Sequence, residues 1–297
     1  DYFRIFSEWY NDLEIYHYVG FLIACKEGSL ETFVKLWEGA SDKKSFEGKL
    51  KDRIQNIIEK CPPLDAQYKE DGSDKRKCKP ILLFHNIQTV INQNANNLKN
   101  DKYQMGVFYK FPFHLFKLEE WDVEHINSNT TNPENDVGTQ KEWLLNVYLG
   151  ADSGTQESIK KYFEVDEDEK RKIFESVKKM FPEKNDWSRK EKNRIWNYTL
   201  LDSGTNRGYG NAIFSGKRRV IIGKDKGKLI PIPEFDGNGK IQIGEEKNAK
   251  SSFVPLCTKH VFMKYYSTTM NDPNYWTKND AEGYLNSLEE CLNELGE

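Results

Sequence analysis

Two neighbouring residues near the middle of the chain, Glu124 and His125, place a carboxylate beside an imidazole. An imidazole can take a proton from water, and carboxylate oxygens are ligands that Mg²⁺ prefers. Hydrolysis of a phosphodiester needs both functions, because a base must activate water while a cation neutralises the phosphate oxygens. A lone His beside a Glu is more often an ordinary surface pair. The interpretation therefore depends on which residues follow.

Two later segments supply polar residues in an order that suits this chemistry. Asn197 begins the run NYTLL, and Asn206 begins NRGYGN, which leads into a segment with helical character. The expected order is a strand at DVEHI, a second strand within Arg194 to Asp202, and then a turn and a helix. Each Asn alone could be a turn residue or a helix cap. Their combined order after His125 favours a catalytic interpretation.

At these residues the sequence resembles the HNH (ββα-metal) nuclease domain of GmrSD-type modification-dependent (type IV) restriction endonucleases. The resemblance covers residues 108 to 270, and DVEHI and NRG are also similar to the HNH domain of RNA-guided CRISPR nucleases. The opening segment EWYNDLEIYHYVGFLI resembles the helical end of the NTP-dependent partner domain that often precedes this nuclease. The segments that carry the likeness are PFHLFKLEEWDVEHI, WNYTLLDSGTNRGYGNAIFSGKR and FVPLCTKHVFMKYYS.

The resemblance implies a role for each motif residue. His125 would be the general base, Glu124 the metal-binding acid and Asn197 the residue that holds the base-bearing loop. Asn206 would be the metal ligand carried by the helix, and Asn211 is its rival for that position. The implied cofactor is one Mg²⁺ or Mn²⁺ ion, and the implied substrate is DNA.

Contacts to DNA are expected from residues in the second half of the chain. Lys217 and Arg218 match a basic position of the family, and Lys259 and Lys264 flank an aromatic run. Packing of that run in the core, with its lysines reaching out to solvent, is an equally good interpretation. The predicted nucleic-acid-binding residues are Arg207, Asn211, Lys217, Arg218, Lys259 and Lys264.

The charge is unevenly distributed along the chain. The net charge is -3, but the segment from Trp187 to Met270 holds 16 Lys and Arg against 7 Asp and Glu. A basic segment on an otherwise acidic chain is a plausible footprint for phosphates. A solvated face combined with acidic tails would give the same count, so charge alone leaves both interpretations open.

The elements that must position these residues define an α+β, mostly helical fold. Apolar residues recur at helical spacing from Tyr2 to about Lys60, with a helix start at Ser29, and again over Ile81 to Ile91. We expect a helical domain over residues 1–116 and an HNH-type nuclease domain over residues 117–297. Further helices are predicted over Lys141 to Leu149 and Glu167 to Met180, and a small hairpin within Leu229 to Ile243.

Other residues receive less specific interpretations. Five scattered cysteines without a CxxC pair favour free thiols and a cytoplasmic location, and Cys257 with His260 is interpreted as core packing rather than a zinc site. No apolar run is long enough to cross a membrane, and the opening stretch lacks the basic leader of a signal peptide. The run from Lys75 to Lys79 is predicted to be a solvated loop. The histidines predicted to be structural are His17, His85 and His114.

The leading expectation is therefore a metal-dependent DNA endonuclease that acts in bacterial defence against phage or modified DNA. The alternative is a non-catalytic DNA-binding or interaction module that keeps the ββα scaffold. A third interpretation makes the helical half a platform for an N-terminal NTP-dependent sensor domain outside this chain.

Overall fold

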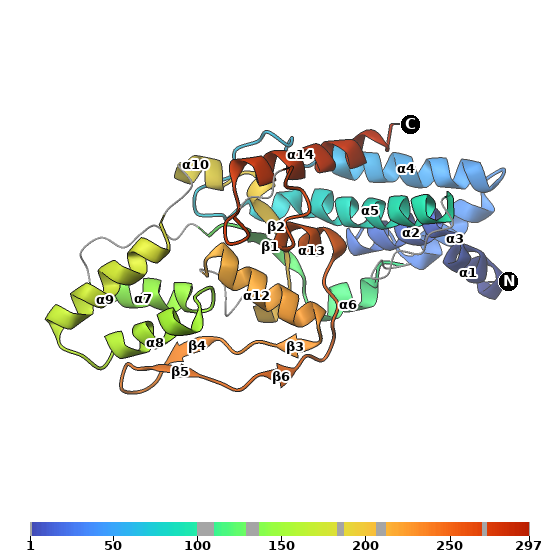
Figure 1. The fold of residues 1–297 in the computed structure, drawn as a ribbon. Coiled ribbons are helices and arrows are strands. Elements are labelled where there is room, and N and C mark those ends of the chain that lie inside the picture. The colour runs from blue at the N-terminus through green and yellow to red at the C-terminus, as the bar shows by residue number, and fades with distance from the viewer. Residues whose placement is uncertain are drawn as a thin grey trace.

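The computed structural model describes residues 2–99, 110–128, 137–182, 187–205, 212–268 and 272–296. Helices dominate this part of the chain, and its strands form three small antiparallel sheets of two strands each. The expected α+β, mostly helical class is therefore confirmed. Figure 1 shows an elongated molecule with the N-terminal helices at one end and a small strand pair near the centre.

The N-terminal helices form because capped starts precede amphipathic runs. The side chains of Asp12 and Asp42 accept hydrogen bonds from backbone N–H groups in the first turns of their helices. Ser29 and Thr32 form a reciprocal capping box, which confirms the helix start predicted at Ser29. These helices are α1 (Tyr2–Asn11), α2 (Leu13–Ala24), α3 (Leu30–Glu38), α4 (Lys43–Glu59) and α5 (Lys79–Lys99).

The largest hydrophobic core joins these helices to later parts of the chain. Phe21 and Phe84 of the N-terminal helices belong to the same buried cluster as Trp121, Phe262 and Trp276. Two helices from the C-terminal third lie along α5, as Figure 1 shows. Residues on both sides of the predicted domain boundary at Phe116 thus share one core, and the boundary itself stays a prediction. The added helices are α6 (Phe113–Leu118), α13 (Leu256–Phe262) and α14 (Lys278–Asn293).

A separate lobe with its own core lies between the two central strands in sequence. Trp143, Tyr162 and Phe174 are buried in it, and it forms the end of the molecule opposite the N-terminus in Figure 1. The helices predicted over Lys141 to Leu149 and Glu167 to Met180 are confirmed, whereas the helix between them was not predicted. The lobe helices are α7 (Val137–Tyr148), α8 (Ser153–Tyr162) and α9 (Glu167–Met180).

The central sheet pairs β1 (Asp122–His125) with β2 (Tyr198–Leu201) in antiparallel register, with His125 opposite Tyr198. The strand predicted over Arg194 to Asp202 is shorter than expected. A short helix, α10 (Arg189–Lys192), and a 3₁₀ turn, η2 (Ile195–Asn197), precede its four paired residues.

Helix α12 (Phe214–Asp225) follows β2 and is tied to the strands by charge. The ammonium of Lys224 lies 2.7 Å from Glu119 and 3.3 Å from Asp202, and it also lies over the ring of Trp121. All three partners flank the β1–β2 pair in sequence, so the helix is held in place beside the sheet.

Small strands close the outer side of α12. The hairpin predicted within Leu229 to Ile243 is present as β4 (Pro233–Phe235) and β5 (Ile241–Ile243). A second pair joins β3 (Lys228–Leu229) to β6 (Lys247–Asn248). None of the helices in the described ranges is long and apolar enough to cross a membrane.

Candidate active site around His125

His125 lies at the end of β1, where pairing with β2 fixes its backbone. Its Nε2 lies 2.9 Å from Oδ1 of Asn193, and its ring meets the edge of Tyr198 with the centroids 4.9 Å apart. The Tyr198 hydroxyl donates to the same Asn193 oxygen at 3.3 Å. Asn193 is itself anchored, because its backbone oxygen accepts a bond from the N–H of Tyr68. The imidazole is therefore oriented by both strands and by the segment before β2.

The surroundings of His125 determine both the tautomer and the charge of its ring. Because an amide oxygen only accepts hydrogen bonds, Nε2 of His125 carries the hydrogen, which makes Nδ1 the basic nitrogen of the neutral ring. Burial lowers the pKa of His125 to about 4, and the charges of Lys217 and Lys75 act in the same direction. At neutral pH the ring is thus unprotonated, as a general base must be.

Asn197 holds the segment that follows His125. Its side chain is fully buried, and its Oδ1 accepts a bond from the N–H of Asn127 at 2.9 Å. Its Nδ2 donates to the carbonyl oxygens of Asn127 and Lys192. Its backbone oxygen also accepts from the N–H of Ile126. The side-chain amide of Asn197 thus makes the hydrogen bonds that a further strand residue would make with its backbone. It extends the pairing of the two strands beyond His125.

Glu124 faces a basic segment that the sequence had placed in a solvated loop. The ammonium of Lys75 lies 2.9 Å from Oε2 of Glu124, with the two side chains 19% and 14% exposed. Arg76 and Lys79 both pair with Asp122 on the same strand. The residues belong to a 3₁₀ turn, η1 (Lys75–Cys78), and to the start of α5. The solvated-loop prediction is therefore wrong for Lys75, because the tertiary fold brings it against β1.

Of the residues predicted to bind a metal ion, the described ranges contain only Glu124. Its carboxylate forms an ion pair with the ammonium of Lys75. The three predicted partners Asn206, Arg207 and Asn211 lie outside the described residues. Among the residues that are described, no group of three or more His, Cys, Asp or Glu side chains could hold a metal ion.

The predicted phosphate contacts within the described ranges are mostly engaged with the protein. Lys217 is only 1% exposed, and its ammonium donates to the His125 carbonyl at 2.7 Å. Lys264 forms a buried ion pair with Asp280, Lys259 pairs with Asp225 at 2.8 Å, and Nε of Arg218 donates to the carbonyl of Phe262. These positions favour structural roles for Lys217 and Lys264. Lys217 instead tethers α12 to the end of β1.

Sequence reasoning missed two residues of this site, Asn193 and Lys75. Asn193 lies four residues before Asn197 with no motif around it, and Lys75 lies in an ordinary run of basic residues. Neither position carried a local signal, because each contact joins segments about 50 to 70 residues apart. The Cys257 thiol is buried and contacts Thr89, in agreement with the predicted core packing.

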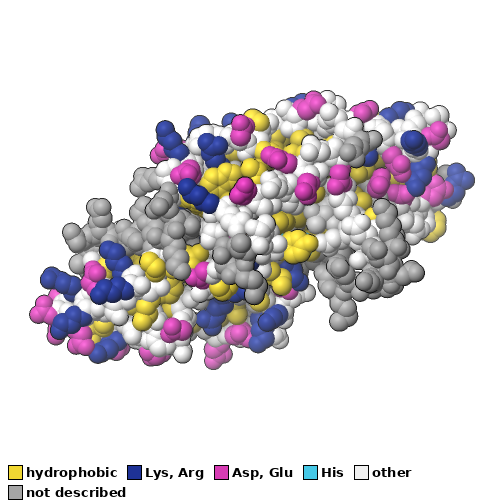
Figure 2. Space-filling model, turned by 45° about the horizontal axis from the view of Figure 1, so that its top comes forward, with side chains coloured by type: hydrophobic (Ala, Val, Ile, Leu, Met, Phe, Trp, Pro, Cys, Tyr) yellow, Lys and Arg dark blue, Asp and Glu magenta, His cyan; other side chains and the backbone are white. Residues whose placement is uncertain are grey.

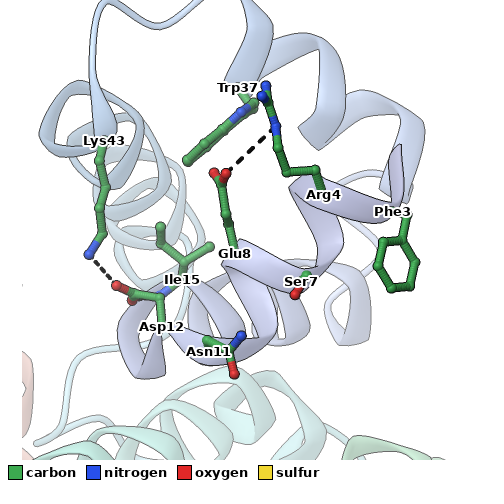
Figure 3. Close-up of a pocket in the computed structure, with 9 residues that line it drawn as sticks. All are labelled: Phe3, Arg4, Ser7, Glu8, Asn11, Asp12, Ile15, Trp37 and Lys43. Atoms are coloured by element: carbon green, nitrogen blue, oxygen red, sulfur yellow. Dashed lines mark hydrogen bonds and ion pairs between the residues drawn. The ribbon is translucent and has the colours of Figure 1, made fainter. Parts of the chain in front are cut away.

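Two hollows lie away from His125. One, of about 550 Å³, opens between α1, α2 and Trp37, and Figure 3 shows the Lys43–Asp12 and Arg4–Glu8 ion pairs in its wall. The other, of about 420 Å³, lies between α12 and the β3–β6 region and includes Asp202 and Lys224. In Figure 2 basic and acidic side chains are interspersed at both ends of the molecule. The Lys161–Glu169 and Lys170–Glu167 pairs illustrate this mixture on the lobe.

Comparisons with protein-family models, with curated proteins and with solved structures found no match to this chain.

Proposed function

We propose that this chain is a metal-dependent DNA endonuclease of the HNH type, in which β1, β2 and the following helix form a ββα core. His125 is the general base, and Glu124 with Asn206 holds one Mg²⁺ or Mn²⁺ ion. In a bacterial cell such an enzyme would act in the cytoplasm against phage or modified DNA, under the control of an N-terminal NTP-dependent domain.

The observation that carries the proposal is the arrangement of three residues around one backbone segment. His125 ends β1 as a neutral imidazole whose Nε2 is held by Asn193, and Asn197 clasps the next residues through Asn127. A surface His–Glu pair would need no such support. Rigid placement of a neutral base is what general base catalysis demands.

The chain's own residues account for the proton transfer. Nδ1 of His125 takes a proton from a water molecule while the oxygen of that water attacks phosphorus. The bond from phosphorus to the 3′ oxygen breaks, and the leaving oxygen takes a proton from solvent. The products are a 5′ phosphate and a 3′ hydroxyl, and the imidazole then returns its proton to solvent. Asn193 keeps the hydrogen on Nε2 and so keeps Nδ1 basic. A bound divalent cation supplies charge neutralisation at the phosphate oxygens.

Plasmid nicking tests the proposal directly. The chain should convert supercoiled plasmid to the nicked form with Mg²⁺ or Mn²⁺ and should fail to do so with a chelator. His125→Ala should slow single-turnover nicking by about 10² to 10⁴ while DNA affinity stays unchanged. His114→Ala is the matched control, because His114 is an exposed histidine on α6. Nicking by His125→Ala at the wild-type rate would reject the assignment.

A non-catalytic DNA-binding module is the competing function. It is favoured by one observation, the ion pair between Lys75 and Glu124, which neutralises the carboxylate that the enzyme would need for its metal. DNA binding without nicking under any metal condition would support that module.

A further inference from the structure

Tyr68 lies against two of the neighbours that orient the imidazole of His125. Its backbone N–H donates to the backbone oxygen of Asn193 at 3.0 Å. Its ring meets the ring of Tyr198 edge-on, with the centroids 5.4 Å apart and the planes at 82°. Tyr68 is only 2% exposed and Asn193 1%, so these contacts are shielded from water. One buried residue therefore touches both the residue that binds Nε2 of His125 and the ring that packs against it.

The residues that precede Tyr68 bind the same stretch of chain. Nε2 of Gln67 donates to the carbonyl oxygen of Lys190 at 2.8 Å and to that of Asn193 at 3.2 Å. Nη1 of Arg194 donates to the carbonyl oxygen of a residue three positions before Tyr68, at 2.9 Å. These bonds join segments that are 123 to 129 residues apart in the chain.

Asn193 lies in a stretch without long elements of its own. It caps the C-terminus of α10, a helix of four residues, and the three-residue turn η2 follows shortly after. A helix this short is not stable by itself in water, so tertiary contacts must hold Asn193 in place. Residues 65–68, here called the brace segment, supply contacts to its backbone oxygen. The direction of that backbone in turn sets where the side-chain oxygen points.

We propose that Tyr68 is a positioning residue for the imidazole of His125, and that the brace segment acts through Asn193 and Tyr198. The inference rests on the proposed function, in which His125 is the base, but the order of the ring can be measured without activity. A general base must be held close to its productive geometry to be effective. The brace segment precedes the predicted domain boundary at Phe116, so the helical part of the chain contributes to the site.

Four variants separate positioning from loss of packing. Tyr68→Leu removes the ring that meets Tyr198, whereas Tyr68→Phe keeps that ring and the backbone bond and removes only a hydroxyl beside the Cys78 thiol. Gln67→Met removes an exposed donor to the Asn193 oxygen and leaves the core intact. Tyr162→Leu is the matched control, because that ring is 1% exposed in the separate core of the lobe.

Nuclear magnetic resonance of the ¹⁵N-histidine-labelled chain measures the order of the ring. The hydrogen on Nε2 of His125 exchanges with water when its bond to Asn193 opens, and its signal is identified by its absence in His125→Ala. Exchange should be at least about tenfold faster in Tyr68→Leu and about 2- to 10-fold faster in Gln67→Met. Tyr68→Phe and Tyr162→Leu should stay within about twofold of wild type.

Plasmid nicking is the second readout. Tyr68→Leu should slow single-turnover nicking by about tenfold or more and leave DNA affinity within about twofold, whereas Tyr162→Leu should change neither. If Tyr68→Leu fails to fold, Gln67→Met decides. Exchange in Tyr68→Leu at the rate of Tyr162→Leu, or in Gln67→Met at the wild-type rate, would overturn the positioning role and leave the nuclease proposal standing. Faster exchange in a chain that nicks no plasmid would support the positioning role and overturn the nuclease proposal.

Discussion

The side-chain amide of Asn197 bonds both the N–H and the carbonyl of Asn127, 70 residues earlier in the chain. This double contact extends the β1–β2 ladder by one residue that has no strand partner of its own. The buried side chain of Asn197 therefore takes the place of a strand backbone in the sheet, immediately after His125.

Replacing Asn197 by Ala should therefore destabilise the fold. The substitution removes the bonds from the Asn197 amide to backbone groups of Asn127 and Lys192 at a fully buried position, which should cost about 2 to 4 kcal/mol of unfolding free energy. Urea denaturation followed by circular dichroism measures the loss. Asn56→Ala is the control, because that amide bonds Asp52 on an exposed helix face and should cost less than about 0.5 kcal/mol. Equal losses for the two variants would contradict a special role for Asn197.

Asn193→Ala should slow nicking by about 10- to 100-fold with little change in DNA affinity. The reason is that the imidazole loses the acceptor that fixes its hydrogen on Nε2. Tyr198→Phe removes the longer, 3.3 Å bond to the same oxygen and should cost less. Single-turnover rates beside a binding titration separate the two effects. A larger loss for Tyr198→Phe would show that ring packing, rather than the Asn193 contact, orients His125.

DNA affinity should depend on Arg219 and not on Lys217. Arg219 is exposed on α12, whereas the Lys217 ammonium is buried against the His125 carbonyl. Arg219→Gln should reduce the slope of log affinity against log salt by about 1, because one phosphate contact fewer releases one counterion fewer. Lys217→Met should leave that slope unchanged. Fluorescence anisotropy over a series of KCl concentrations is the measurement, and the reverse result would place the DNA on a different surface.

Stability should fall as the pH is lowered below 6.5. Burial lowers the pKa of His17 to about 4 and that of His85 to about 3. The folded protein keeps both rings neutral while the unfolded chain takes up protons below pH 6.5, so stability is complete above that pH and is lost toward pH 4. Each histidine should contribute a loss of about 2 kcal/mol between pH 6.5 and 5.

A variant at the buried His17 tests that contribution, and a variant at an exposed histidine serves as its control. In His17→Gln the amide oxygen could still accept from the N–H of Phe111, as Nε2 does now, but it has no proton to gain. Urea midpoints measured across this pH range should therefore change less in His17→Gln than in wild type. His114→Gln, at an exposed position, should retain the wild-type dependence.

Local patterns determined much of the helical scaffold. The Ser29–Thr32 pair and the apolar spacing of Glu167 to Met180 act within a few residues, so they could be interpreted without knowledge of the fold. The order of His125, Asn197 and the following helix was also visible in the sequence. The first residue of β2 could not be predicted from the sequence. Ile195–Asn197 forms a 3₁₀ helix instead of strand, and the length of that helix depends on tertiary contacts.

The site itself depended on contacts between segments that are far apart in the chain. The packing of η1 against β1 determines whether Lys75 faces solvent or Glu124. A run of basic residues in the sequence does not indicate which of the two occurs. Lys217 shows the same limit, since its neighbours in sequence suggested a phosphate contact and the packing of α12 turned it toward the His125 carbonyl. Periodicity and capping act through neighbouring residues, whereas the partner of a charged side chain is selected by the whole fold, because burial makes an unpaired charge costly.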